Sequence, residues 1–266
     1  MDKKLLLLMA AAGFLSSCSD NSEPEESGRQ RGQFHILEYT PAPGQFINEG
    51  MDVTTPEEAI AWAEDRISQE KYVSLGGFGG YIIADFGHSV SNFAIKGNSF
   101  AGSNEPGIVY VMVDANSNGL PDDGAWLELP HSEEADAITD YQVTYYRPLE
   151  PNSPVKWTDN LGNQGEIAYV AAFHKQDYYY PEWIAADSYT LSGTLLPSLS
   201  VEENGRWNHK PYPWGYVDNN GSDTDKQWTE FRLDSPVDFI KVQTAVNAQA
   251  GSLGEISTEV CGFKEL

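Results

Sequence analysis

The chain has 266 residues, with 16 Lys and Arg against 40 Asp and Glu, so its formal net charge is −24. So acidic a protein repels nucleic acid and anionic lipid, and we expect it to bind neither. The length allows one large all-β domain or two small ones.

The N-terminal residues form a short basic segment followed by an apolar one. A basic pair at 3–4 precedes an apolar run at 5–15, which is too short to span a bilayer. We therefore expect residues 1–17 to be a signal peptide. The run ends in Leu-Ser-Ser-Cys, which resembles the lipobox of bacterial lipoproteins. That resemblance implies cleavage before Cys18 and lipidation of its thiol and new amino group.

Residues 18–32 are acidic and contain Ser and Pro, so they are expected to form a flexible tether and not to pack. Acidic residues directly after Cys18 resemble the surface-export signal of Bacteroidetes lipoproteins. This second resemblance implies a lipid anchor in the outer membrane with the protein exposed on the cell surface. No composition break follows, and residues 33–266 are predicted to form a single domain.

One helix is predicted, over residues 54–69. Thr55 and Glu58 form a capping box, and Pro56 stands in the first helical turn, where a missing N–H costs nothing. Apolar residues follow at helical spacing. We expect this helix to pack over one end of a sheet.

The remainder is predicted to be β, because short runs of β-forming residues are separated by Gly, Asn, Asp and Pro. The glycines at 76–80 are no phosphate loop, since a strand follows them; they are expected to let a strand pass close to a neighbour. Residues 147–228 are poorest in strand signal and are expected to be a long irregular segment that carries function. The predicted strands are 72–75, 81–86, 93–96, 108–113, 126–129, 141–146, 229–233 and 239–245.

This pattern of short strands is typical of a jelly-roll-type β-sandwich with one short N-terminal helix and long loops. The domain holds one cysteine, Cys261, so no disulfide can form within it. Its apolar neighbours favour a small buried residue over a reactive thiol.

The stretch DANSNGLPDDGAW at 114–126 offers oxygen ligands at the spacing of a calcium loop, with Gly119 at the sixth position. Ala125 stands where a bidentate Glu is expected, so a structural Ca²⁺ would bind weakly, with a Kd of about 10⁻⁴–10⁻³ M. The alternative is a turn-rich loop with no ion. A second, less regular cluster lies at 218–225. The predicted ligands of the first loop are Asp114, Asn116, Asn118, the carbonyl of Leu120, Asp122 and Asp123.

Two aromatic runs, at 178–183 and 207–216, contain rings beside polar side chains and suit stacking on a sugar or another flat ligand. The alternative for each ring is packing in the core. The residues predicted to line a ligand-binding surface are Tyr179, Tyr180, Trp183, Trp207, Trp214 and Tyr216.

No catalytic motif is evident. The five histidines show no zinc-hydrolase spacing, and no nucleophile elbow is present. The acidic residues could include a glycosidase-like carboxylate pair, which sequence cannot place. An enzyme is therefore possible but less expected than a binding protein, and no catalytic residue is named.

Residues 42–50, 74–86, 95–129, 143–148 and 240–262 resemble a group of Bacteroidetes cell-surface lipoproteins. The resemblance implies a carbohydrate-binding-like jelly roll that is accessory to nutrient uptake by TonB-dependent transporters, in some loci for cobalamin-type cofactors. The expected function is capture of a glycan or corrinoid for an outer-membrane transporter. The alternatives are a glycan-active surface enzyme and a protein-binding or adhesion module.

Overall fold

The computed structural model describes residues 33–204, 206–247 and 256–266. The predicted signal peptide (1–17), the predicted tether (18–32) and the predicted lipidation site Cys18 lie outside the described residues. Among the helices of the described part, none has the length and apolarity that a membrane span requires.

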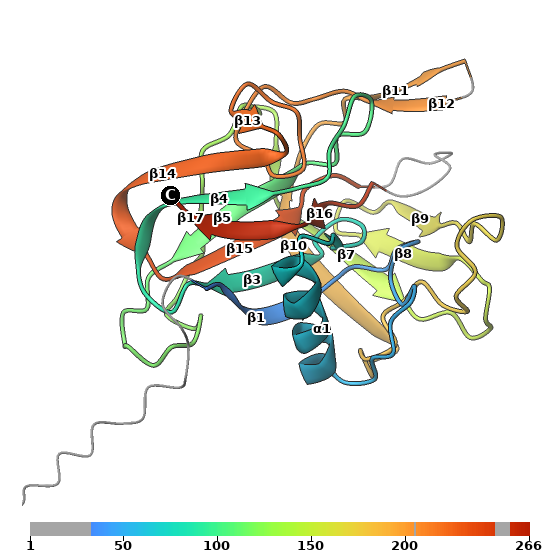
Figure 1. The fold of residues 1–266 in the computed structure, drawn as a ribbon. Helices are drawn as coiled ribbons and strands as arrows, with labels where there is room; N and C mark the ends of the chain where they lie inside the picture. The colour runs from blue at the N-terminus through green and yellow to red at the C-terminus, as the bar shows by residue number, and fades with distance from the viewer. Residues whose placement is uncertain (1–32, 205, 248–255) are drawn as a thin grey trace, which may run out of the picture.

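Two antiparallel sheets form the main sandwich (Figure 1). The five-stranded sheet has the order β1-β3-β15-β5-β6 and comprises β1 (His35–Thr40), β3 (Tyr81–Asp85), β15 (Phe239–Thr244), β5 (Gly107–Met112) and β6 (Leu127–Glu128). The four-stranded sheet has the order β13-β14-β4-β17 and comprises β13 (Thr224–Asp225), β14 (Trp228–Val237), β4 (Val90–Lys96) and β17 (Gly262–Glu265).

The core of this sandwich contains side chains from both sheets. Val109 and Val242 of the first sheet and Phe93 and Phe231 of the second are buried in one apolar cluster. The two phenylalanine rings stack with their centroids 5.3 Å apart. Burying each such side chain stabilises the fold by about 1.5–3 kcal/mol.

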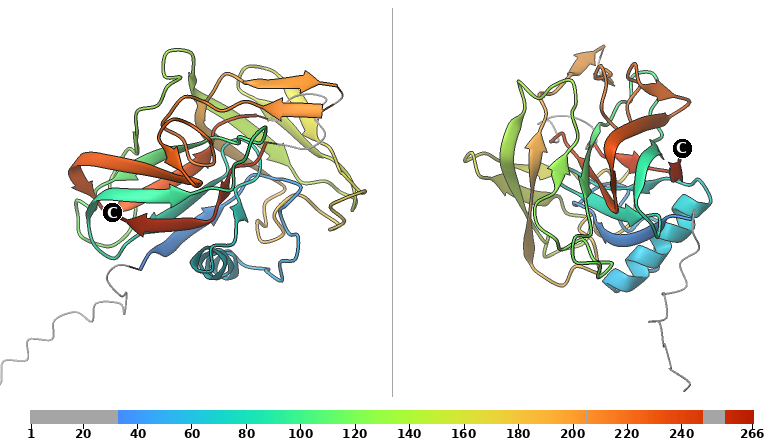
Figure 2. Two further views of the ribbon diagram at one scale, coloured as in Figure 1. Left: turned by 45° about the horizontal axis from the view of Figure 1, so that its top comes forward. Right: turned by 90° about the vertical axis from the view of Figure 1, so that its left-hand side faces the viewer.

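Helix α1 (Pro56–Ser68) begins at Thr55 with the predicted capping box, in which Glu58 N donates to Thr55 Oγ1 at 3.2 Å. The helix buries the face formed by Ala59, Ala63 and Ile67. It lies beside β1, along the edge of the five-stranded sheet (Figure 2). The predicted helix and its packing role are confirmed.

A third sheet, drawn on the right of Figure 1, has the order β10-β7-β8-β9. It buries Tyr145, whose hydroxyl donates to the carbonyl of Phe78 at 2.8 Å, against the glycine-rich loop. Its strands are β10 (Ser188–Leu195), β7 (Ile138–Tyr146), β8 (Val155–Asp159) and β9 (Gln164–Ile167). Two short pairs complete the fold: β11 (Ser200–Glu203) with β12 (Arg206–His209), and β16 (Glu259–Val260) with β2 (Val73–Ser74).

The structure confirms an all-β sandwich whose described part contains the single helix α1. It corrects the expectation that residues 147–228 are irregular. Strands β8 to β13 all lie there, and β10 pairs with β7 over most of its length. Ser, Thr, Gly and Lys interrupt the alternation of apolar and polar residues along these segments. The segments form strands because they pair with neighbouring strands in the folded protein.

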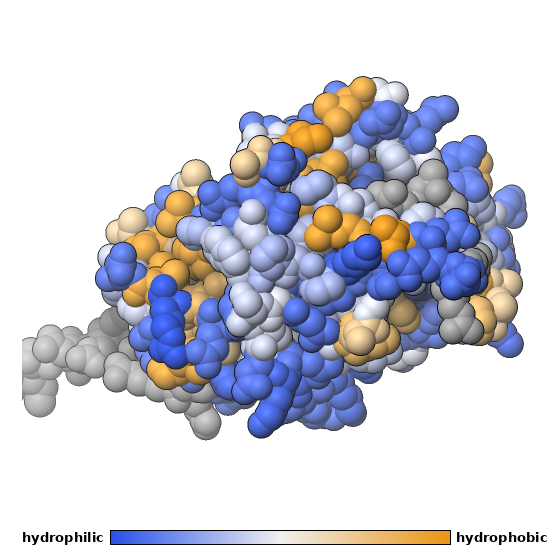
Figure 3. All heavy atoms as spheres, turned by 90° about the horizontal axis from the view of Figure 1, so that it is seen from above, coloured by the Kyte–Doolittle hydropathy of each residue, from blue (hydrophilic) through white to orange (hydrophobic). Residues whose placement is uncertain are grey.

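Cys261 is 5 % exposed and free, and burial raises the pKa of its thiol to about 12. The expectation of a small buried residue is confirmed. On the face of the molecule shown in Figure 3, hydrophilic side chains predominate and apolar ones gather in a few separate patches.

Candidate functional site

The loop predicted to bind calcium joins β5 to β6, which pair with each other, so it is the tip of a long hairpin. Asp114 accepts hydrogen bonds from the backbone N–H groups of Asn118 (3.1 Å) and Gly119 (2.8 Å). The amide nitrogens of Asn116 and Asn118 donate to the Asp122 carboxylate. These bonds fix the shape of the loop, and calcium binding stays a prediction.

The remaining predicted ligands of that loop are placed as follows. The side chain of Leu120 is exposed, and its N–H donates to Asn118 Oδ1 at 2.8 Å. One carboxylate oxygen of Asp123 is buried with no hydrogen-bond partner within the protein. The strand flanks expected for this loop are confirmed.

Most of the aromatic residues predicted to line a binding surface lie in the core. Tyr179, Tyr180 and Tyr216 are 0 % exposed and Trp183 is 5 % exposed. The Tyr180 hydroxyl donates to the Ala186 carbonyl at 2.8 Å. A tyrosine whose hydroxyl finds a backbone acceptor can be buried at little cost, so these rings support loops from within.

The other two predicted aromatics are more accessible. Trp214 is 43 % exposed. Trp207 is half-buried and lies on β12, in the short β11-β12 hairpin. The six predicted residues therefore do not form one continuous aromatic surface.

A hollow of about 460 Å³ lies at one end of the β10-β7-β8-β9 sheet. Four segments form it: the start of β7, β8 with the turn that follows it, the end of β10 and the residues after β15. Its volume falls within the range of small-molecule sites. The residues that line it are Asp136, Ile138, Tyr141, Trp157, Asp159, Asn163, Leu195, Leu196, Pro197, Ser198, Val246 and Asn247.

Hydrogen bonds fix the polar side of this pocket. Asn247 Nδ2 donates to the Tyr141 hydroxyl (2.9 Å), which donates to Asp159 Oδ2 (2.8 Å). Asp159 also accepts from the N–H groups of Leu161 (3.0 Å) and Asn163 (2.6 Å) and from the Asn163 side chain (2.8 Å). Desolvation raises the pKa of Asp159, but these hydrogen bonds outweigh it and the pKa is lowered. The carboxylate is therefore charged and held in place.

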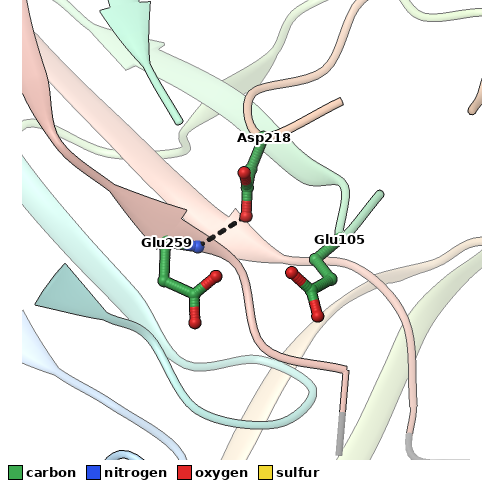
Figure 4. Close-up of side chains that lie close together, drawn as sticks. All are labelled: Glu105, Asp218 and Glu259. Atoms are coloured by element: carbon green, nitrogen blue, oxygen red, sulfur yellow. Dashed lines mark hydrogen bonds between the residues drawn. The ribbon is translucent and has the colours of Figure 1, made fainter. Parts of the chain in front are cut away.

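A second candidate is a group of three carboxylates: the half-buried Glu105, just before β5, and the buried Asp218 and Glu259 (Figure 4). One oxygen from each lies within 4.8 Å of the others. Asp218 accepts backbone N–H groups of Glu259 (2.9 Å) and Asn98 (2.7 Å). We call this group the carboxylate cluster.

Carboxylates are the ligands that hard divalent cations prefer, so the cluster could hold a metal ion. Protonation of the carboxylates can replace a metal ion, because negative charges in an apolar interior must be neutralised. Desolvation and the neighbouring carboxylates raise the pKa of Glu105 to about 8 and that of Glu259 well above its usual value. Desolvation raises the pKa of Asp218 to about 7, against the opposing effect of its backbone hydrogen bonds.

No family model matches the chain, and a search of curated proteins found no match.

Sequence reasoning missed both groups. Tyr141 stands in a predicted strand whose period-two alternation places it on the same face as Tyr145, a signal that could have marked it as inward-facing. Trp157 lies in the segment expected to be irregular. The three carboxylates are separated by more than forty residues from one another, so no spacing could have indicated them.

Proposed function

We propose that the protein is a surface-anchored lipoprotein that captures a nutrient, a glycan or a corrinoid, and passes it to a TonB-dependent outer-membrane transporter. The observation that carries the binding role is the pocket beside Trp157. It combines apolar walls with a few fixed polar groups, which is the usual character of a small-molecule site. The anchor and the transporter rest on the lipobox-like sequence before Cys18 and on the family resemblance.

Catalysis at this pocket is less well supported. Its lining carboxylates are Asp136 and Asp159. A glycosidase needs one carboxyl group that stays protonated to act as a general acid. The lowered pKa of Asp159 makes that residue an acceptor and not an acid. Asp159 therefore does not supply the general acid that a glycan-active enzyme would need at this pocket.

The test is ligand binding by the mature protein, measured by isothermal titration calorimetry against neutral oligosaccharides and cyanocobalamin. Trp157→Ala is expected to weaken binding by roughly ten- to hundredfold, the effect of removing a central aromatic anchor. Trp214→Ala, which removes an exposed ring outside the pocket, is the matched control and should bind as the wild type does. Loss of binding in the control alone would move the site to the aromatic loop, and no binding by the wild type would refute capture.

We also propose that the 114–126 loop binds Ca²⁺ weakly, as its ligand spacing predicts. With a Kd of about 1 mM, 10 mM Ca²⁺ stabilises the folded state by about 1.4 kcal/mol, or about 3–5 °C in melting temperature. Asp114→Ala should abolish the shift, whereas Asp140→Ala, on β7, should keep it. A melting temperature that is the same with Ca²⁺ and with chelator would refute the proposal.

A further inference from the structure

The pocket beside Trp157 has an uneven charge and hydrogen-bonding character. Its lining residues include two carboxylates, Asp136 and Asp159, and no Lys, Arg or His. The nearest lysine along the strand, Lys156, does not line this pocket. It lines a second hollow, which Trp157 also lines, and its cross-strand partner there is Glu166. The field inside the pocket is therefore negative, in a chain whose net charge is −24.

The polar groups of the pocket are mainly acceptors, apart from the indole N–H of Trp157, which has no hydrogen-bond partner within the protein. Asn163 uses its side-chain nitrogen on Asp159, and Asn247 uses its side-chain nitrogen on Tyr141. The Tyr141 proton is committed to Asp159. The lining thus offers carboxylate and amide oxygens, and a ligand that pairs with them must bring donors.

The pocket also has apolar lining residues. Ile138, Leu195 and Val246 line it together with Trp157, and none of these three carries a side-chain hydrogen-bonding group. A ligand that fills the pocket therefore presents one apolar face and an edge of donor groups.

We infer that the pocket selects an uncharged, donor-rich ligand, bearing hydroxyl or carboxamide groups on an apolar body, and rejects the anionic counterpart of the same shape. The inference rests on the proposed capture function and adds charge selection to it. Hydroxyls of a neutral glycan and carboxamides of a corrinoid supply the same chemistry. A carboxylate in their place would face Asp159 with no cation in the pocket to offset the repulsion.

Four ligands in two matched pairs test this by calorimetry: a gluco-oligosaccharide with the corresponding oligoglucuronide, and cyanocobalamin with its monocarboxylic acid derivative. In whichever pair binds, the neutral member should bind on the order of tenfold more tightly than the anion at low salt. In 1 M NaCl, where the Debye length is about 3 Å, the difference should shrink.

Asp136→Asn removes a pocket charge at an exposed position, and Asp136→Lys reverses it. Both substitutions should reduce the affinity ratio between the neutral and the anionic ligand, and Asp136→Lys should reduce it more than Asp136→Asn. The control Asp177→Lys lies outside the pocket and should leave this ratio unchanged. Equal or tighter binding of the anion by the wild type would overturn charge selection and leave capture standing. If none of the four binds, the proposed function itself is refuted.

Discussion

Raising the pH from 6.5 to 8 is expected to lower the melting temperature of the domain. The expected decrease is about 3–5 °C per pH unit for each proton that the carboxylate cluster binds in the folded state and releases on unfolding. The pKa values of Glu105 and Asp218 are raised to about 8 and 7, chiefly by desolvation, and desolvation also raises the pKa of Glu259 well above its usual value. In the unfolded chain these groups titrate near pH 4. The stabilisation is therefore complete below pH 4 and is lost as the pH rises through the folded-state values.

The chosen window separates the cluster from other titrating groups. Burial lowers the pKa of His209, and the resulting contribution is complete above pH 6.5. Desolvation lowers the pKa of Lys241 to about 8, and that contribution increases stability only as the pH rises beyond this value. Carboxylates with a lowered pKa, such as Asp159, change the stability of the fold only at pH values below this window.

Glu259→Gln removes one carboxylate while keeping its shape and a donor toward Glu105. This variant is expected to lose much of the pH dependence between 6.5 and 8, whereas Glu203→Gln, on the exposed surface of β11, should keep it. A wild-type melting temperature that stays constant over this window would contradict the prediction. Calorimetry of wild-type unfolding at pH 7 in buffers of different ionisation enthalpy gives an independent check, because unfolding should release at least one proton.

The carboxylate cluster also shows where sequence reasoning stops. Glu105, Asp218 and Glu259 lie in three distant segments, and backbone pairing brings the first two together: Gly107 and Val217 form an isolated bridge. Asp218 itself belongs to the acidic stretch 218–225, which was predicted as a second, less regular cation site. Its carboxylate instead points inward, to backbone N–H groups of other segments.

Local signals were predictive where the residues themselves fix the backbone. The capping box fixed the start of α1, and the nearly continuous apolar run at 108–113 became β5, all of whose residues are buried. The glycine cluster at 76–80 was expected to allow close approach, and the structure confirms this.

Signals based on side-chain type were less reliable. A tyrosine-rich run beside Pro, Asp and Glu has the composition of an exposed binding loop. The same run can fill a core when backbone carbonyls accept the hydroxyl protons, as the His174 carbonyl does for Tyr179 at 3.1 Å. Composition does not distinguish these outcomes, because the acceptors come from the tertiary fold.

The second large effect is expected at the glycine-rich loop, in Gly76→Ala. Gly76 has φ = +68°, and a Cβ atom there would lie 1.9 Å from the Ala42 carbonyl oxygen, which is backbone and cannot move aside as a side chain would. The substitution combines a left-handed conformation with overpacking, so we expect a loss of roughly 3 kcal/mol or more. That is a large part of the stability of a typical domain.

Two further glycines separate the two causes. Gly50 has nearly the same φ, +65°, with open space around it, so Gly50→Ala should cost only the conformational share, about 1–2 kcal/mol. Gly80 has no such φ, but its Cβ would lie 1.8 Å from the Leu75 carbonyl oxygen and 2.4 Å from Ala42 N. Gly80→Ala should therefore cost mainly the steric share.

Urea unfolding of the three variants measures these contributions. Gly76→Ala should be the least stable of the three variants, and Gly50→Ala should be the most stable of them. Gly80→Ala should also lose stability, because the added Cβ would separate Ala42 N from the Leu75 carbonyl, which now form a hydrogen bond of 3.0 Å. If Gly76→Ala and Gly80→Ala cost no more than Gly50→Ala, the chain at Ala42 can shift, and the close approach of the two backbone segments does not require glycine.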